Sequence, residues 1–445
     1  MTDKAAVLVV GDVYVDLAMS SPDTESKMRL GGVVHAARGL WASGIPYAVA
    51  AVCPSYLVDD ARMYVLAHGC TEFIWLGEVS GAPNVIVIGD TREIAWQGYE
   101  DLLRDKRQAR LHDQASALTQ YTNVLVFPGS YRLDALHSMF AGVPATFDLD
   151  VAYDVADWVA LAPFKGQLRT VIISTSSPLF MREAAQDISP LLHAVTQLGA
   201  RWLLLKENRG GSRLFKLGGG TVELLPAQLG KTVNSVGVGD AFSAVLSGLS
   251  AQGDVVEAAW RGAQVATRYA QTTYPDDLGR DVQRDFGLSL STLRALWGTS
   301  LPWHERPQHS IYLAAPDFSY FPKPEIDRVI DALRYHNFRL RRPVQEVGEL
   351  PRDASLADRQ GAYERDVSLL KECAAVFAVP LGRDPGTLVE VGMALALAKP
   401  VIVFDPRQEN NNTMVVAGSA VYSTDLDDCL NELYRVLGRP SPYLS

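Results

Sequence analysis

The sequence of 445 residues lacks the features of a disulfide-stabilised, metal-binding or membrane-spanning protein. Only four cysteines occur, and none stands in a CxxC pair: Cys53, Cys70, Cys373 and Cys429. The eight histidines form no HxxxH or HExxH pair, so we expect no metal site built from histidine or cysteine ligands. No apolar run reaches the roughly 18 residues that a membrane-spanning helix needs. These absences predict a cytoplasmic protein with free thiols and no membrane partner.

Positive charge is scarce as well. The chain has 41 Lys and Arg against 51 Asp and Glu, which gives a formal net charge of −10. We interpret the one basic cluster, Arg339, Arg341 and Arg342, as the solvated end of a strand, so nucleic acid is not an expected partner. Hydrophobic residues make up 48% and charged residues 21% of the chain, as in globular proteins of two or three domains.

Short strand-like runs alternate with amphipathic stretches, which is typical of a layered α/β fold. The candidate strands of the first 300 residues are VLVVGDV, AVAAV, NVIVIGD, NVLVFPG, TVIIS and RWLLLKE. The apolar VLVVGDV run is too short for the core of a signal peptide and is closed by Gly11 and Asp12, so we expect it to be a first strand.

The alternation stops at LPWHERPQ, residues 301–308, and then begins again. IYLAAP, AAVFAVPLG and PVIVFD are the next candidate strands, and PEIDRVIDALRYHNF is a candidate helix. Two prolines and mixed charge favour a linker at 301–308. We therefore predict one domain of residues 1–300 and a smaller, doubly wound, flavodoxin-like parallel-sheet domain of residues 309–445.

A glycine-rich turn precedes one predicted helix of the first domain. In VNSVGVGDAFSAVLSGLS, residues 233–250, the turn contains Gly237, Val238, Gly239 and Asp240. Glycines at a helix N-terminus let backbone N–H groups approach an anion closely. An aspartate there can accept a proton from a hydroxyl group that attacks a phosphoryl group. Because the motif is short, a plain loop in which Asp240 only caps the helix stays an alternative.

This turn resembles the GAGD signature of the ribokinase (PfkB) family of sugar and nucleoside kinases. Three other segments follow in that family's order: VVGDVYVDL at 9–17, GGVVHAARGLWASG at 31–44 and KENRGGSRLF at 206–215. The resemblance covers about residues 5–298 and implies a ribokinase-like α/β fold. It also implies ATP and Mg²⁺ as cofactors, with the nucleotide at Gly237, Val238 and Gly239 and with Asp240 as the base.

The same resemblance implies a sugar site near the start of the chain. Asp12 or Asp16 would bind sugar hydroxyls, and Gly31 and Gly32 would pack against the sugar. Three departures from the family pattern stand beside these matches: Asn234 and His35 replace an aspartate and an asparagine, and IISTSSPLF at 172–180 lacks the acidic residue of the magnesium-associated NxxE segment. A kinase and a nucleotide- or nucleoside-sensing domain that performs no transfer are both compatible with this pattern.

In the second domain, Glu390 interrupts an apolar run that otherwise predicts a buried helix, with Leu388, Val389, Val391 and Met393 around it. Burying an unpaired carboxylate costs several kcal/mol, and no basic residue follows on that helix before Lys399. A carboxylate can trap the oxocarbenium-like sugar formed when an N-glycosidic bond breaks, while a second acid protonates the leaving base. We expect Glu390 near the helix start, where backbone N–H groups would keep it ionised.

The surrounding sequence resembles the nucleoside 2-deoxyribosyltransferase family, including its hydrolytic relatives. The resemblance rests on IYLAAPDF at 311–318, on the D-x-G-T-x-x-E-x-G-x-A pattern at 384–394 and on NNNTM at 410–414. It implies that Glu390 is the nucleophile and Asp366 the acid/base, that Tyr312 orients the nucleophile, and that Asp384 holds sugar hydroxyls.

The resemblance further implies that Asn412, with Met414, binds the sugar of a neighbouring subunit, and hence a homo-oligomer. Alternatives from the residues alone are an ordinary exposed carboxylate at Asp366 and a core side chain at Tyr312, and the register of Asn412 is open by one residue. The sequence thus predicts an enzyme of nucleosides, nucleotides or pentoses. Its second domain would transfer or hydrolyse the glycosyl group, and its first would act as a kinase or as a sensor.

Overall fold

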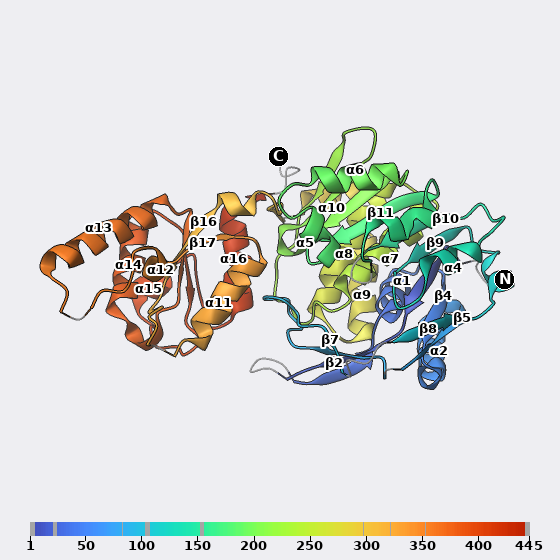
Figure 1. Cartoon of the computed structure of the whole chain (residues 1–445), viewed down its shortest axis with the longest axis horizontal. Coiled ribbons are helices and arrows are strands. Elements are labelled where there is room, and N and C mark those ends of the chain that lie inside the picture. Colours follow the sequence, from blue (N-terminus) through green and yellow to red (C-terminus); the bar gives the residue numbers. More distant parts are fainter. Residues whose placement is uncertain are drawn as a thin grey trace.

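The computed structural model describes residues 5–20, 25–81, 83–102, 107–151, 155–296, 298–320, 322–351 and 353–440. It contains a ten-stranded sheet in the N-terminal part and a separate five-stranded sheet in the C-terminal part, on the right and the left of Figure 1. The predicted α/β class is confirmed. Among the helices of these ranges, none combines the length and the apolar character that crossing a bilayer requires.

The ten-stranded sheet has the order β14-β13-β12-β11-β10-β9-β1-β4-β5-β8. Neighbours from β12 to β5 run parallel, and β13, β14 and β8 are antiparallel. Runs rich in Val, Ile and Leu form the parallel strands because helices cover both faces of such sheets. The strands are β1 (Val7–Asp12), β4 (Tyr47–Cys53), β5 (Cys70–Ser80), β8 (Gln108–Leu111), β9 (Asn123–Val126), β10 (Thr146–Asp150), β11 (Leu168–Ser174), β12 (Trp202–Lys206), β13 (Ser212–Lys216) and β14 (Val222–Leu225).

A small sheet of order β3-β2-β6-β7 stands beside the large one. The predicted strand NVIVIGD belongs to this small sheet, where it pairs in parallel with the strand that carries Asp16. The strands are β2 (Val15–Ala18), β3 (Lys27–Leu30), β6 (Val85–Ile88) and β7 (Glu100–Asp101).

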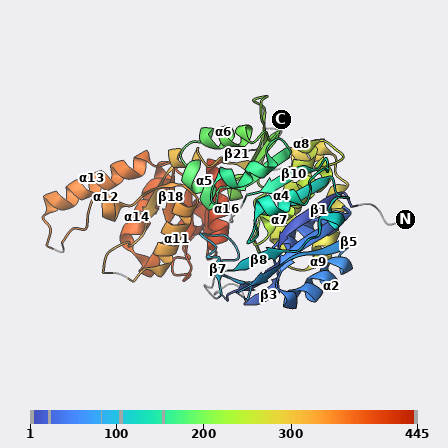
Figure 2. The same cartoon turned by 45° about the vertical axis from the view of Figure 1, so that its right-hand side comes forward.

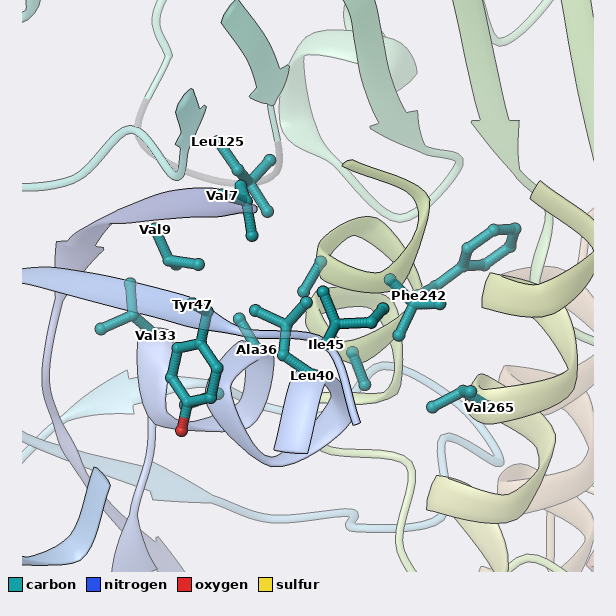
Figure 3. Packing of buried hydrophobic residues seen from close by; sticks show 14 of the residues in the cluster. Val7, Val9, Val33, Ala36, Leu40, Ile45, Tyr47, Leu125, Phe242 and Val265 are labelled. Carbon is teal, nitrogen blue, oxygen red and sulfur yellow. The ribbon is translucent and has the colours of Figure 1, made fainter. Parts of the chain in front are cut away.

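Helices α1, α7 and α8 pack on one face of the large sheet, with Leu40, Phe242 and Val265 in a shared apolar core (Figure 3). A Cβ at Gly39 would lie 3.0 Å from the Cα of Ala241, so glycine allows α1 and α7 to approach closely. The helices of the N-terminal part are α1 (Val33–Ala42), α2 (Val58–Ala67), α3 (Ala115–Leu118), α4 (Leu133–Ser138), α5 (Pro178–Glu183), α6 (Ser189–Gln197), α7 (Val238–Ser250), α8 (Val255–Gln271), α9 (Pro275–Phe286) and α10 (Leu290–Ala295), with 3₁₀ turns η1 (Ser55–Leu57), η2 (Trp158–Phe164) and η3 (Asn208–Gly210).

The C-terminal sheet is parallel throughout and has the order β17-β16-β18-β19-β20. This is the 2-1-3-4-5 order of flavodoxin-like folds, as predicted. Its strands are β16 (Ser310–Ala314), β17 (Arg339–Arg341), β18 (Ala375–Ala378), β19 (Val401–Phe404) and β20 (Val421–Ser423). Its helices are α11 (Pro324–Tyr335), α12 (Pro343–Glu346), α13 (Leu356–Glu372), α14 (Pro385–Ala396), α15 (Thr413–Gly418) and α16 (Leu426–Leu437), with the 3₁₀ turn η5 (Leu381–Arg383).

Two apolar clusters lie on the two faces of this sheet. One contains residues of α11 and α16, and the other contains residues of α13, α14 and α15. In both views α16 lies toward the N-terminal part and α13 lies far from it (Figures 1 and 2). The C-terminal part therefore presents one helical face to the N-terminal part and the other to solvent.

The segment predicted as a linker is packed between the two parts. Leu301, Trp303 and Arg306 are buried, and the Arg306 guanidinium donates to the backbone oxygens of Leu301 and Glu207. This segment includes the 3₁₀ turn η4 (Arg306–Gln308). The strand β15 (Thr299–Ser300), which ends just before the segment, pairs with β21 (Arg439–Pro440). The domain limits 1–300 and 309–445 stay a prediction.

Candidate functional site

A cavity of about 430 Å³ lies against α13 and α14 in the C-terminal part. Three of the predicted residues, Tyr312, Asp366 and Glu390, line it together. The other lining residues are Leu350, Arg359, Ala362, Tyr363, Val367, Leu370, Pro385, Gly386, Val389 and Met393. A mostly apolar wall with a few convergent polar groups is typical of a small-molecule site.

Tyr312 connects the buried sheet to the cavity. Its side chain is fully buried on β16, and its hydroxyl donates a hydrogen bond of 2.6 Å to Oε1 of Glu390. The ring of Tyr312 therefore packs in the core, as the alternative from the residues alone expected, and its hydroxyl also contacts the carboxylate.

Two expectations about Glu390 are wrong. It is the sixth residue of α14, so it lies beyond the first turn, whose free N–H groups were expected to keep it ionised. Its helix is not buried all round either, since only Thr387, Val391 and Ala394 are buried and Val389 is 57% exposed. Burial raises the pKa of Glu390 to about 7, with Asp366 and Asp384 adding to the rise and the Tyr312 hydrogen bond opposing it.

Asp366 faces the same cavity from α13. Burial raises its pKa, and its Oδ1 atom is buried without a hydrogen-bond partner among the described residues. An ordinary solvated carboxylate would show neither property. A carboxyl group with a raised pKa and a free oxygen is suited to donate a proton to a bound molecule.

Asp384 and Asn412 both serve as helix N-caps. The Oδ2 atom of Asp384 accepts from the backbone N and the hydroxyl of Thr387, at 2.7 and 2.8 Å. The Asn412 side chain accepts from the backbone N of Met414 at the start of α15. Neither Asn412 nor Met414 lines the cavity with Glu390, and Met414 is 76% exposed. Asn410 is buried against Pro380 and Asp405, and the choice between Asn411 and Asn412 as the sugar-binding residue stays open.

A second cavity, of about 270 Å³, lies at the N-terminus of α7 in the N-terminal part. Gly237, Val238 and Gly239 line it, together with Lys206 from the end of β12. Gly237 is the N-cap residue with φ of 81°, a left-handed conformation that favours glycine. A Cβ there would also lie 2.2 Å from the ring of His35. The two glycine motifs predicted from the sequence are thus in direct contact.

Asp240 is the third residue of α7 and does not cap it, because Gly237 occupies the N-cap position. Burial raises the pKa of Asp240 to about 7, with a further rise from Asp150 and an opposing effect of Lys206. The Lys206 ammonium donates to Oδ2 of Asp150 at 2.7 Å and to the carbonyl of Gly239 at 3.3 Å. A carboxyl group with a pKa near neutral pH thus lies beside backbone groups suited to an anion.

The two predicted sugar-binding aspartates are engaged by the protein itself. Oδ2 of Asp12 accepts from Tyr14 and from the backbone N and hydroxyl of Ser130. Oδ2 of Asp16 accepts from Nε2 of His35 at 2.7 Å.

Gly31 lies against Asp16 so closely that a Cβ would come within 2.1 Å of its carboxylate. Gly32 is the N-cap of α1. Of these two carboxylates, the buried Oδ1 of Asp12 has no partner within the described ranges.

The cavity at α7 has backbone groups that suit a nucleotide phosphate, but its described residues lack a cluster of side chains that suits a metal ion. The Gly237–Gly239 turn fits phosphate through its backbone, whereas no group of three His, Cys, Asp or Glu side chains that could hold a metal occurs in the described part of the chain. The 172–180 segment brings Ser174 and Ser176 to the cavity, and neither has the charge of a carboxylate. A Mg²⁺ ion would therefore be held chiefly by phosphate oxygens and water.

Several cavity residues were not predicted. Arg359 and Tyr363 precede Asp366 by seven and three residues on α13, a spacing that places all three along one helix face, and this spacing could have indicated them. Arg92, which lines the second cavity, follows a strand of the small sheet and stands in no recognisable motif.

Two segments of the chain match models of known protein families. Residues 311–429 match the family model "Nucleoside 2-deoxyribosyltransferase". All of Tyr312, Asp366, Asp384, Glu390 and Asn412 lie within this match. In the N-terminal part, residues 172–277 match the model "pfkB family carbohydrate kinase". Both predicted resemblances are confirmed, in the predicted order.

Solved structures similar to the chain include three small-molecule kinases. The ribokinase from Giardia lamblia is 12% identical, with a TM-score of 0.46 over 63% of this chain and 99% of that one. A putative ribokinase II from E. coli, solved with ATP and Mg²⁺, is 11% identical, with a TM-score of 0.44 over 63% and 100%. The adenosine kinase from Sinorhizobium meliloti is 12% identical, with a TM-score of 0.46 over 63% and 98%. No curated protein matched the chain.

Proposed function

We propose that the deoxyribosyltransferase-like part cleaves the N-glycosidic bond of a nucleoside or nucleotide. The observation that carries this proposal is the convergence of Tyr312, Asp366 and Glu390 on one cavity, with the Tyr312 hydroxyl 2.6 Å from the glutamate. The ionised Glu390 attacks the anomeric carbon, and the carbon–nitrogen bond breaks. Asp366 delivers its proton to the departing base. The glycosyl group then passes from Glu390 to another base or to water.

Three residues outside the lining of this cavity would have the roles that the resemblance to the nucleoside 2-deoxyribosyltransferase family implies. Asp384 keeps one carboxylate oxygen on the α14 cap and would use the other for a sugar hydroxyl. The exposed Asn412 and Met414 would contact the sugar bound by an adjacent copy of the chain, so the active form would be a homo-oligomer.

The test is chromatography of nucleosides and 5′-nucleotides after incubation with the protein, with and without an acceptor base. Base release without acceptor indicates a hydrolase, and exchange that needs acceptor indicates a transferase. We expect Glu390→Gln to lower either reaction by about 10³-fold or more, because the covalent step is lost. Glu364→Gln, on the exposed side of α13, is the matched control. Full activity in Glu390→Gln would exclude this mechanism.

For the kinase-like part, we propose that ATP binds in the cavity at Gly237–Gly239 and that Asp240 accepts the proton of an acceptor hydroxyl. A nucleotide sensor is the second candidate. One observation favours it: Nε2 of His35 forms a hydrogen bond with the Asp16 carboxylate, which would otherwise hold a sugar. Labelled ATP with a panel of pentoses and nucleosides separates the two. Transfer that depends on Asp240 excludes the sensor, and tight ATP binding without transfer to any acceptor excludes the kinase.

A further inference from the structure

The cavity at the kinase-like turn has a wall that comes from the other part of the chain. Asn431, on α16, lines this cavity together with residues of the N-terminal part. The C-terminal part therefore contacts the space in which we propose that the nucleotide binds.

Asn431 joins two loops of the cavity. Its Oδ1 atom accepts a hydrogen bond of 2.6 Å from the Arg209 guanidinium, on the η3 turn. Its Nδ2 atom donates to the carbonyl of Gly230 at 3.0 Å. Arg209 and Gly230 both line the cavity, so one side chain of α16 sets the distance between two of its walls.

A buried ion pair fixes this arrangement. The Arg209 guanidinium also donates to Oδ1 of Asp427 at 2.7 Å, and Oδ2 of Asp427 accepts from the backbone N of Thr232 at 3.0 Å. Asp427 is fully buried and Arg209 is 9% exposed. Separating the two partners would leave an unpaired buried charge, which costs free energy. The pair therefore holds α16 in one position against the cavity.

A connecting segment after β6, residues 89–98, adds a second link, and we call it the strap. Arg92 of the strap pairs with Asp425 at 2.8 Å, and Ile94 packs in the core cluster of the C-terminal part. The carbonyl of Thr91 accepts from the backbone N of Ser235 at 2.6 Å, two residues before Gly237. The strap thus connects the glycine turn to the C-terminal core.

We infer that this cavity is a composite site, in which Asn431 positions the walls that bind an adenine nucleotide, and that nucleotide binding and the docking of α16 stabilise each other. The inference rests on the proposed nucleotide binding. Because binding energies are reciprocal, a nucleotide held by both parts must strengthen the contact between them.

The first test is calorimetric titration of the full chain with ATP and with ADP. We expect Asn431→Ala to weaken binding about three- to tenfold, the effect of losing one or two net hydrogen bonds. Arg439→Ala is the control, because Arg439 of the C-terminal part forms an exposed ion pair with Glu305 of the 301–308 segment, outside the cavity lining. Equal affinity of Asn431→Ala and the wild type would overturn the inference.

The second test is hydrogen–deuterium exchange with and without ATP, first of the wild type and then of Asn431→Ala. We expect ATP to slow exchange both in the 233–240 turn and in α16. In Asn431→Ala at saturating ATP, the turn should stay protected and the effect on α16 should shrink. Protection of the turn alone in the wild type would overturn the inference while leaving nucleotide binding intact. A wild type that binds neither ATP nor ADP would overturn both.

Discussion

The two proposed reaction centres use carboxyl groups with pKa values raised to about 7, yet their surroundings differ. Glu390 accepts one hydrogen bond, from Tyr312, and shares an open cavity with the free oxygen of Asp366. In the N-terminal part, by contrast, both carboxylates predicted to hold the sugar already bond to the protein, Asp12 to Ser130 and Asp16 to His35. Of these two, only Oδ1 of Asp12 is buried without a partner among the described residues. A family motif therefore does not show that a side chain is free to bind a substrate. Only carboxylate oxygens without a partner in the protein are available for this.

The largest effect that we expect in this comparison is the loss of phosphoryl transfer when Asp240 is replaced. If the N-terminal part is a kinase, Asp240→Asn should lower ATP-dependent transfer by about 10²- to 10⁴-fold, since a general base is lost. Transfer by the wild type should rise with pH through about 7, as Asp240 becomes ionised. Initial rates with labelled ATP measure both effects.

The control for this change is Asp113→Asn, at an exposed loop position. Base release by the C-terminal part should be the same in both variants. Unchanged transfer in Asp240→Asn would remove the residue from the reaction.

A smaller effect is expected for Tyr312→Phe. The change keeps the buried ring and removes the hydrogen bond to Glu390, so base release should fall about tenfold, as for one lost bond to a charged group. Because this bond lowers the pKa of Glu390, the acidic limb of the pH–rate profile should move from about 7 to higher pH. Rates between pH 5 and 9 measure the shift, and a limb that stays in place would contradict the contact.

The smallest effect concerns stability. The pKa of Glu390 is raised on folding from about 4.5 to about 7, so ionisation destabilises the folded state above pH 7 and has no effect below pH 4.5. Glu390→Gln should therefore raise the melting temperature at pH 8 by a few degrees, and by less at pH 5. Thermal unfolding of both proteins at the two pH values tests this, and a lower melting temperature at pH 8 would contradict the raised pKa.

Much of the fold could be predicted because its strands are short apolar runs between helical patterns. The candidate strands around Val9, Val49 and Leu204 are central strands of the large sheet, and the C-terminal strand order follows the flavodoxin-like expectation. NVIVIGD could not be assigned to the small sheet, because sheet membership depends on pairing partners distant in the sequence.

The site was predictable where a motif fixes the spacing and less so where tertiary contacts decide. Asp384 caps the helix that carries Glu390, so their relation follows from sequence. The position of Glu390 beyond the first turn depends on where Asp384 caps that helix. The pairing of His35 with Asp16, and of Arg209 with Asp427, joins residues that no local pattern relates.

The position of the C-terminal sheet has a consequence for the order of events. The Glu390 cavity lies against α13 and α14, whereas α16 on the opposite face borders the cavity at Gly237–Gly239. A sugar released at Glu390 cannot pass through that sheet to Asp240 within one chain. If the two parts of one chain catalyse successive steps, the intermediate has to leave the Glu390 cavity and travel around the sheet, where an added scavenging enzyme would compete for it.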